Sequence, residues 1–363
     1  DHPPLELLFT VDEERGLHGA AQLELTEHIE SRHLINLDSE DEAIFFVGCA
    51  GGIDIDIDCE LQPLTSTFNS ATRVSISGLR GGHSGIHIHE RRLNAVQAIL
   101  DILREINGNE GSFPPVLSLQ AGTRKNALAR SGELIIGGDK RELCRQAAER
   151  LRRQWLQDEP NIAFHIEMID GSAYHHGYPP AAIECLNRLP LGVIRWEPKL
   201  PGVVRTSSNL GLVNTTENTG HWLYHARSSS QEELLQLVGQ YRDMAQQAGL
   251  KIDTQNLYPG WLSDPDHPWI RNLVESWQRF FASEPDPLRH ASVTTVHAGL
   301  EAGILTSKIP DCIAISFGPE IHNAHSPDER MSLSSAARTY RFLLHILAHN
   351  AYRPHDNAQE DPQ

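Results

Sequence analysis

Four short segments of the sequence combine residue types that could perform hydrolytic chemistry. Three are rich in carboxylates or place a histidine beside them, at residues 10–14, 36–42 and 323–329, and the fourth, residues 81–85, places a histidine in a glycine-rich turn. Carboxylates and imidazoles are common zinc ligands, and a carboxylate beside a bound metal can take a proton from water. Together the segments predict metal-assisted hydrolysis.

Each segment also has a purely structural interpretation when it is taken alone. The adjacent glutamates after Val11 suit a solvated helix N-terminus, residues 38–42 suit a charged loop, His325 suits an ordinary loop, and residues 81–85 suit a simple turn. The glycines around Ser84 do not form a nucleophile elbow, and the chain has neither an H-E-x-x-H motif nor a Walker loop. A functional interpretation therefore requires the segments to converge.

The acidic segments follow apolar runs that predict strands. Residues 5–11 and 33–38 flank a helical pattern at 17–29, which predicts a βαβ unit in a largely parallel sheet. A further strand is predicted at 313–317, with helices at 268–282 and 334–349. Ligands collect at the carboxyl ends of such strands, so we expect the acidic segments and His325 to meet there.

The middle of the chain has a different pattern. Strands at 71–78, 116–119, 134–136 and 162–169 and helices at 93–106 and 142–156 predict a βαββαβ layer, followed by strands at 203–213 and 222–226 and a helix at 231–248. The predicted fold is an α/β domain, with a mixed, largely parallel sheet flanked by helices, and an inserted α+β domain. The predicted boundaries are 1–70 with 258–352, 71–257 for the insertion, and 353–363 for a disordered tail.

Composition excludes several classes of function. The net charge of −17 over 363 residues argues against nucleic acid, and no apolar run reaches the roughly 18 residues of a membrane helix. The five cysteines are odd in number and form no C-x-x-C pair. That usage indicates a reducing compartment, and hence the cytoplasm.

Eight stretches of the chain resemble the M20 metallopeptidases, and most closely their aminoacyl-histidine dipeptidase branch. In the family's order they read PLELLFTVDEERGLHGA, LINLDSEDE, VGCAGG, SGLRGGHSG, RTSSNLG, YPGW, VHAGLEAG and GPEIHNAHSPDER. The resemblance implies a catalytic domain with two divalent metal ions, zinc or alternatively cobalt or manganese, and a lid domain inserted into it. It also implies hydrolysis of dipeptides, Xaa-His among them.

The resemblance assigns a role to each candidate residue. Glu13 is expected to be the general base, Glu14 and His325 to bind one metal, and Asp38 to bind the other. His83 is expected to polarise the scissile carbonyl from the lid. Four further residues are expected to bind the substrate carboxylate or line the pocket: Asn209, Arg227, Gly299 and Glu301.

Two departures and several alternatives accompany the resemblance. The family's upstream H-x-D motif and bridging aspartate have no counterpart after Asp1, and residues 126–129 read N-A-L-A where the family has N-A-I-P. The first departure predicts a truncated chain with weak metal binding and negligible activity.

The alternatives are an M20 aminoacylase, carboxypeptidase or deacylase, or an inactive fragment. The lid is expected either to form a homodimer or to supply its own second half in cis.

Overall fold

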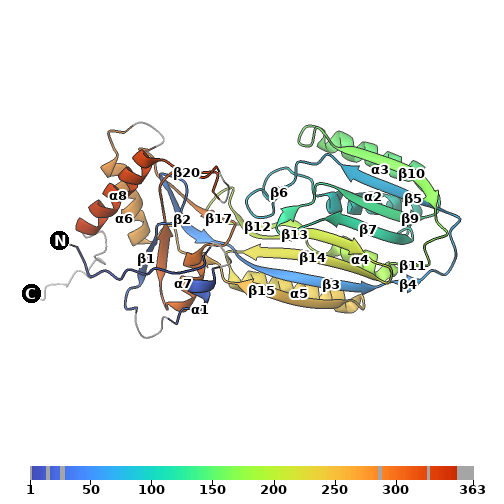
Figure 1. Cartoon of the computed structure of the whole chain (residues 1–363), viewed down its shortest axis with the longest axis horizontal. Helices are drawn as coiled ribbons and strands as arrows, with labels where there is room; N and C mark the ends of the chain where they lie inside the picture. Colours follow the sequence, from blue (N-terminus) through green and yellow to red (C-terminus); the bar gives the residue numbers. More distant parts are fainter. Residues whose placement is uncertain (1, 14–16, 25–28, 285–287, 325–327, 350–363) are drawn as a thin grey trace, which may run out of the picture. The chain divides into compact units, whose positions relative to one another are not determined.

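The chain forms two compact units in the computed structural model, which describes residues 2–13, 17–24, 29–284, 288–324 and 328–349 (Figure 1). Unit 1 contains Asp1–Gly51, Pro198–Val203 and Pro259–Gln363, and unit 2 contains Gly52–Glu197 and Val204–Tyr258. The predicted tail, residues 353–363, lies outside the described residues.

A five-stranded mixed sheet forms the centre of unit 1. Its strands are β1 (His33–Asn36), β2 (Ile44–Cys49), β16 (Trp261–Leu262), β17 (Ser292–Val296) and β18 (Ile313–Ser316). The order is β1-β18-β2-β16, with β17 also beside β2. β1 is parallel to β18 and β17 to β2, but β2 is antiparallel to both β18 and β16. The prediction of a largely parallel sheet is not confirmed. The segment from β1 to β2 is short and reverses the chain direction, whereas a parallel return would need a longer crossover connection.

Helices cover both faces of this sheet. On one face α6 (Pro268–Phe280) and α8 (Leu333–Ala348) pack against the strands, and their core includes Trp277 and Phe342 around Phe45. On the other face lie α7 (Glu301–Lys308) and the short α1 (His18–Gln22). The apolar residues of α6 and α8 recur every three to four positions, as a helix with one buried face requires. Both helices begin and end within two residues of their predicted positions.

The predicted βαβ unit at the start of the chain does not form. Residues 5–11 are not a strand, and Leu7, Phe9 and Val11 are 79%, 87% and 70% exposed. The predicted helix at 17–29 is limited to His18–Gln22 among its described residues. An apolar run becomes a strand only where neighbouring strands and a core can pack against it, and no described strand pairs with this segment.

Unit 2 contains a nine-stranded sheet built from two similar halves. Half A comprises β5 (Ser70–Ser77), α2 (Ala95–Glu110), β7 (Val116–Gly122), β9 (Gly132–Gly137), α3 (Arg141–Trp155) and β10 (Ala163–Asp170). Its strands lie in the order β10-β5-β9-β7, and every pair is antiparallel. This is the βαββαβ layer that the sequence predicted.

Half B repeats the arrangement. It comprises β3 (Gly51–Glu60), α4 (Pro180–Arg188), β13 (Val204–Thr215), β14 (Thr219–Ser228), α5 (Gln231–Gln247) and β15 (Lys251–Tyr258), with β12 (Gly192–Trp196) beside β13. In both halves the fourth, first, third and second strands lie in that order across the sheet, and the halves join through β7 and β13. Half A is inserted between β3 and α4, and β4 (Gln62–Pro63) pairs with β11 (His176–Gly177) where the chain leaves and returns.

One core spans both halves of unit 2. Helices α2, α3, α4 and α5 all contribute to it, and its largest fully buried side chains are Trp222, Tyr224 and Tyr241. In β3 the sequence alternates strictly, so that Ile53, Ile55 and Ile57 enter this core while Asp54, Asp56 and Asp58 point to the other face. The opposite face of the sheet is therefore polar along β3.

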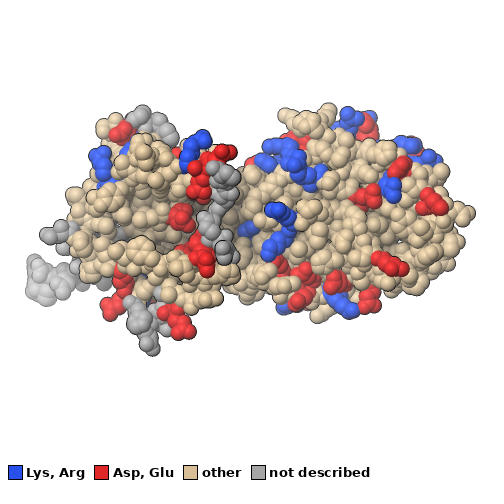
Figure 2. Space-filling model, in the orientation of Figure 1, with Lys and Arg blue, Asp and Glu red and all other residues tan. Residues whose placement is uncertain are grey.

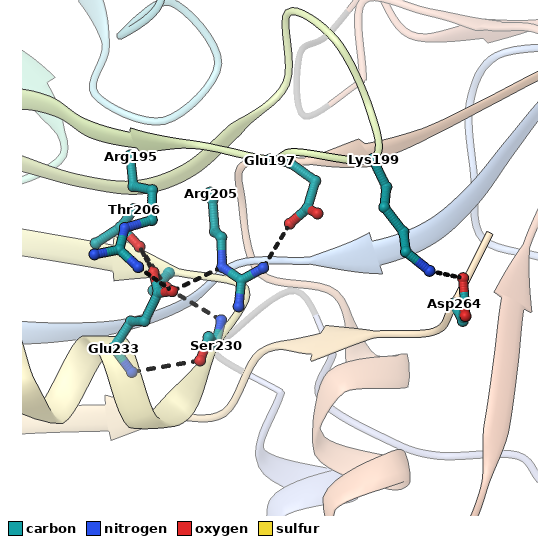
Figure 3. A network of polar contacts seen from close by, with 9 residues as sticks. Arg195, Glu197, Lys199, Arg205, Thr206, Ser230, Glu233 and Asp264 are labelled. Carbon is teal, nitrogen blue, oxygen red and sulfur yellow. Dashed lines mark hydrogen bonds and ion pairs between the residues drawn. The ribbon is translucent and has the colours of Figure 1, made fainter. Parts of the chain in front are cut away.

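A short excursion of the chain, residues 198–203, belongs to unit 1 although both of its flanks belong to unit 2. On the unit 2 side, Arg205 pairs with Glu197 at 3.1 Å and with Glu233 at 3.0 Å (Figure 3). Within unit 1, Lys199 pairs with Asp264 at 2.7 Å. Polar contacts thus hold the two flanks within unit 2 and the excursion within unit 1.

The observed division differs from the predicted boundaries at two places. Residues 52–70 were placed with the first domain, but β3 forms part of the nine-stranded sheet of unit 2. Residues 198–203 were placed in the insertion, but Leu200 packs in the core of α6 and α8. The strict alternation in β3 and the single buried leucine explain these two differences.

Candidate active site

Of the acidic candidates of unit 1, Asp38 follows a strand of the sheet, whereas Glu13 follows a segment that is not a strand. Glu13 is half-buried, and its carbonyl accepts a hydrogen bond from the N–H of Leu17 at 2.8 Å. Asp38 is exposed two residues after β1. Glu14 and His325 lie outside the described residues, so their predicted convergence stays a prediction.

The segment that carries Asp38 lies beside the segment that leads toward residue 325. β1 and β18 are parallel neighbours, so both end at the same edge of the sheet. Beyond the strands, the N–H of Phe317 donates to the carbonyl of Asn36 at 3.2 Å, and that of Ile321 donates to the carbonyl of Glu40 at 2.9 Å. This adjacency is the one that the sequence predicted from the two strand ends.

A buried polar cluster fixes the turn at Asp38. The N–H of Asp38 donates to Asn36 Oδ1 at 3.1 Å, and the hydroxyl of Ser316 donates to the same oxygen at 2.6 Å. The hydroxyls of Ser39 and Ser316 lie 2.5 Å apart. A Cβ on Gly318 would meet the carbonyl oxygen of Ser39 at 1.8 Å, so only glycine permits this close approach.

Carboxylates crowd this edge of unit 1. Burial raises the pKa of Asp41, and the nearby charge of Glu320 raises it further. Arg338 balances part of the charge through a two-pronged ion pair with Glu42, at 2.7 and 2.6 Å. Figure 2 shows acidic side chains gathered on the flank of unit 1 over which β17 and β20 (Arg330–Met331) lie. Such crowding favours a bound cation.

The described residues alone do not complete a metal site. Across the described ranges, no group of three or more His, Cys, Asp or Glu side chains is arranged to hold a metal ion. The predicted ligand set adds Glu14 and His325 to Asp38, and two carboxylates with an imidazole suit a zinc-like divalent cation. The donor chemistry therefore fits a metal, with Asp38 as its described member.

Strand directions place Gly299 and Glu301 away from Asp38 in unit 1. β2 and β17 run opposite to β1 and β18 and so end at the other edge of the sheet. Gly299 follows β17, and the thiol of Cys49, at the end of β2, lies 3.8 Å from the carbonyl of Leu300. Glu301 is 9% exposed, and its Oε1 has no hydrogen-bond partner.

Two glycines present His83 in unit 2. Gly81 and Gly82 have φ of +65° and +143°, and a Cβ on either would collide with the side chain of Arg130, Arg92 or His87. The turn lets the backbone of His83 pair with that of Ala127. The glycine-rich segment therefore has a structural requirement as well as its predicted function.

The ring of His83 has a defined tautomer. Its Nδ1 accepts hydrogen bonds from the N–H groups of Gly85, at 3.2 Å, and Ile86, at 3.1 Å, so the ring proton must lie on Nε2. Burial, together with the charges of Arg227, His87 and His225, lowers the pKa of His83 to about 4. His83 is thus a neutral hydrogen-bond donor at physiological pH.

This shift predicts a pH dependence of stability. His83 titrates near its ordinary value of 6.5 when unfolded but near 4 when folded, so the unfolded state binds a proton that the folded state lacks. The free energy of unfolding should fall as the pH falls from about 6.5 toward 4, and His83→Ala should reduce that fall. Urea unfolding at several pH values measures it, with exposed His89→Ala as the control. Equal slopes in both variants would contradict the shift.

Arg227 is a buried cation without a carboxylate partner among the described residues. It is 5% exposed, NH1 donates to the phenol oxygen of Tyr258 at 2.9 Å, and its Nε has no hydrogen-bond partner. A buried guanidinium is costly unless an anion pairs with it. Arg227 is therefore suited to bind an anionic ligand, and its role in binding the substrate carboxylate stays a prediction.

The described contacts of Asn209 are structural, and its predicted role in substrate binding stays a prediction. It is 2% exposed, and its amide donates to the carbonyls of Lys125 at 3.0 Å and Ala127 at 2.9 Å. Its Oδ1 accepts from Asn94 Nδ2 at 3.0 Å. Both amide hydrogens are committed, so Asn209 fixes residues 125–127 and retains no donor for a substrate carboxylate.

We therefore expect Asn209→Ala to destabilise unit 2. The change leaves two part-buried carbonyls without this donor and removes one of the two acceptors of the Asn94 amide, at a cost of about 1–3 kcal/mol per group left unsatisfied. Urea denaturation measures the loss. Unchanged stability together with a raised KM would instead support the predicted role in substrate binding.

The sequence reasoning missed a second histidine in unit 2. The ring nitrogen Nδ1 of His225 lies 2.6 Å from Asp54 Oδ1, while Lys125 and Asn256 donate to Oδ2 of the same carboxylate at 2.5 and 2.6 Å. His225 and Asp54 lie on β14 and β3 and are both buried. The sequence held no local signal for this pair, because Asp54 is one of three alternating aspartates on the polar face of β3, and only the fold shows that it is buried.

Comparison with known proteins identifies the family of the chain. The model of Peptidase family M20/M25/M40 matches residues 1–349. The cytosol non-specific dipeptidase of Escherichia coli (strain K12) is 31% identical over 359 residues, which cover 95% of this chain and 71% of that protein. The crystal structure of the aminoacylhistidine dipeptidase from Vibrio alginolyticus has a TM-score of 0.83 and 29% identity, over 93% of this chain and 69% of that one.

The chain is therefore a hydrolase of the peptidase class. It belongs to Peptidase family M20/M25/M40, a metallopeptidase family that depends on divalent metal ions. In the described part of the chain, no helix combines the length and the apolar character needed to cross a membrane.

Proposed function

We propose that this enzyme hydrolyses dipeptides, Xaa-His among them, in a metal-dependent reaction. The names of the two relatives support this substrate class. The observation that carries the proposal is Arg227, a buried cation without a carboxylate partner among the described residues. A dipeptide always places its C-terminal carboxylate one residue from the scissile bond, so one fixed arginine can position that bond; the restriction to dipeptides rests on the two relatives.

The proposed reaction assigns one role to each candidate residue. In unit 2, Arg227 binds the substrate carboxylate, and the Nε2–H of His83 donates to the scissile carbonyl oxygen as negative charge develops there. In unit 1, Glu13 takes a proton from the attacking water and passes it to the leaving amine. Because His83 stays neutral, it can donate this hydrogen bond throughout the neutral pH range.

We further propose that Glu14, Asp38 and His325 are metal ligands, in a site for two divalent ions, zinc or alternatively cobalt or manganese. When bound, such ions lower the pKa of a bound water and act as Lewis acids. The proposal rests on the family, on the adjacent ends of β1 and β18, and on the crowded carboxylates of this edge.

The proposed location is the cytoplasm.

Replacement of Arg227 tests the function. Arg227→Gln in the full-length enzyme should raise KM for a dipeptide roughly tenfold to a hundredfold, because a charged hydrogen bond to the substrate is lost. Without ligand, its stability should stay level or rise, because an unpaired buried charge is removed. Steady-state kinetics and urea denaturation measure the two effects, and exposed Arg152→Gln is the control.

The substrate profile distinguishes the proposal from the related acylases and carboxypeptidases. Dipeptides, N-acetyl amino acids and longer peptides all have the same C-terminal carboxylate but differ beyond the scissile bond. Turnover of dipeptides well above that of the other two classes is expected. Turnover of only N-acetyl amino acids would contradict dipeptide hydrolysis.

A further inference from the structure

The second ring nitrogen of His225 is an unused hydrogen-bond acceptor in unit 2. The side chain is 4% exposed, and Nε2 has no hydrogen-bond partner. Nδ1 carries the ring proton, because it lies 2.6 Å from the carboxylate of Asp54, which can only accept. Nε2 therefore has a lone pair. Buried polar atoms without a partner are rare in folded proteins, and a bound ligand is one reason for them.

The surrounding charges hold this arrangement in one protonation state. Burial would raise the pKa of Asp54, but hydrogen bonds from His225, Lys125 and Asn256 lower it to about 2. Burial also lowers the pKa of His225; the bond to Asp54 opposes this shift, and the charge of Arg227 adds to it. His225 is therefore neutral at physiological pH, and its Nε2 accepts rather than donates.

His225 lies next to the proposed carboxylate site. It precedes Arg227 by two residues on β14, so the two side chains share one face of the sheet, about 6.8 Å apart along the strand. Tyr258 links them, since its ring stacks on His225 with centroids 6.4 Å apart and its phenol oxygen accepts from Arg227. Electrostatic interactions with Arg227 and His225 also lower the pKa of His83.

Building on the proposed function, we propose that His225 Nε2 accepts a hydrogen bond from the side chain of the substrate's C-terminal residue. With its carboxylate on Arg227, that residue directs its side chain along β14 toward His225. The imidazole of a C-terminal histidine carries an N–H whose distance from the carboxylate is comparable with the spacing between His225 and Arg227. Leucine has similar bulk but no donor. His225 is thus a specificity residue that favours C-terminal histidine.

The expected preference follows from the burial of the acceptor. A leucine side chain would leave Nε2 unpaired in a dry site, whereas a donor satisfies it. Sites that hydrogen-bond a substrate group discriminate strongly against analogues that lack the group. We expect glycyl-histidine to exceed glycyl-leucine in kcat/KM by roughly tenfold to a hundredfold, the range of one buried hydrogen bond.

Substitution of His225 is the first arm of the test, in the full-length enzyme. His225→Phe keeps an aromatic ring and removes the acceptor, so the histidine-to-leucine ratio of kcat/KM should fall toward one. The matched control is His221→Phe, on the same face of β14, whose ring contacts Asp56 and Asp58. An unchanged ratio in folded His225→Phe would overturn the proposal.

The second arm uses the unaltered protein, in case the variant does not fold. In ¹⁵N NMR of histidine side chains, free histidine should shift His225 Nε2 as a donor approaches it, and free leucine should not. Equal shifts with both amino acids would also overturn the inference. Loss of dipeptide turnover and of binding of both amino acids in the wild type would instead contradict the proposed function itself, and this inference with it.

Discussion

Glu13→Gln is expected to lower kcat by roughly 10²–10⁴-fold, the range typical for loss of a general base. The amide preserves the shape of the side chain but cannot take a proton from water. Substrate binding and metal content should therefore stay near those of the wild-type enzyme. Steady-state kinetics and metal analysis of the full-length enzyme measure the three quantities.

The control for this experiment is Glu24→Gln, an exposed glutamate of the same N-terminal segment. It should leave kcat unchanged. Near-native turnover of Glu13→Gln would show that another group takes the proton. A fall in metal content equal to the fall in turnover would make Glu13 a ligand rather than a base.

His83→Ala is expected to lower kcat by about 10²–10³-fold, the effect of removing one preorganised donor from a developing oxyanion. KM should change little, because the hydrogen bond strengthens mainly in the transition state. Kinetics with a dipeptide measures both parameters. Of the two backbone N–H groups that now donate to Nδ1, that of exposed Ile86 can bond to water, whereas Gly85 is buried, so the free energy of unfolding should be measured beside the kinetics.

His89→Ala is the matched control, since His89 is an exposed histidine six residues later. His83→Gln offers a conservative comparison, because its amide restores a donor and should recover part of the lost turnover. If His83→Ala lowers only the free energy of unfolding and leaves kcat intact, the glycine-rich turn has a structural role alone.

The helices and most strands of half A could be predicted because each one buries a single face. In α2, Leu103 and Ile106 continue an apolar stripe that begins at Val96, and such periodicity survives any tertiary context. Residues 5–11 show the opposite case. Their apolar run has the composition of a strand, but a strand also needs a partner, and a local pattern cannot supply one.

The candidate site divides in the same way. Asp38 could be placed from its strand end, and Arg227 from its motif, because both depend on local sequence. The structural contacts of Asn209 could not be predicted, since an asparagine in a strand looks the same in the sequence whether it binds a ligand or a neighbouring loop. His225 was missed because its partner, Asp54, is 171 positions away in the sequence.

The duplication within unit 2 has a consequence for how the site is assembled. His83 comes from half A, whereas Arg227 and His225 come from β14 of half B, and the halves meet through β7 and β13. Two connections within one chain join the halves, so their pairing is a unimolecular event with a high effective concentration. Dilution therefore cannot separate the two halves. The junction between them gives no reason for specific activity to depend on the protein concentration. A mutation that weakens the β7–β13 pairing should lower the free energy of unfolding and should not cause dissociation.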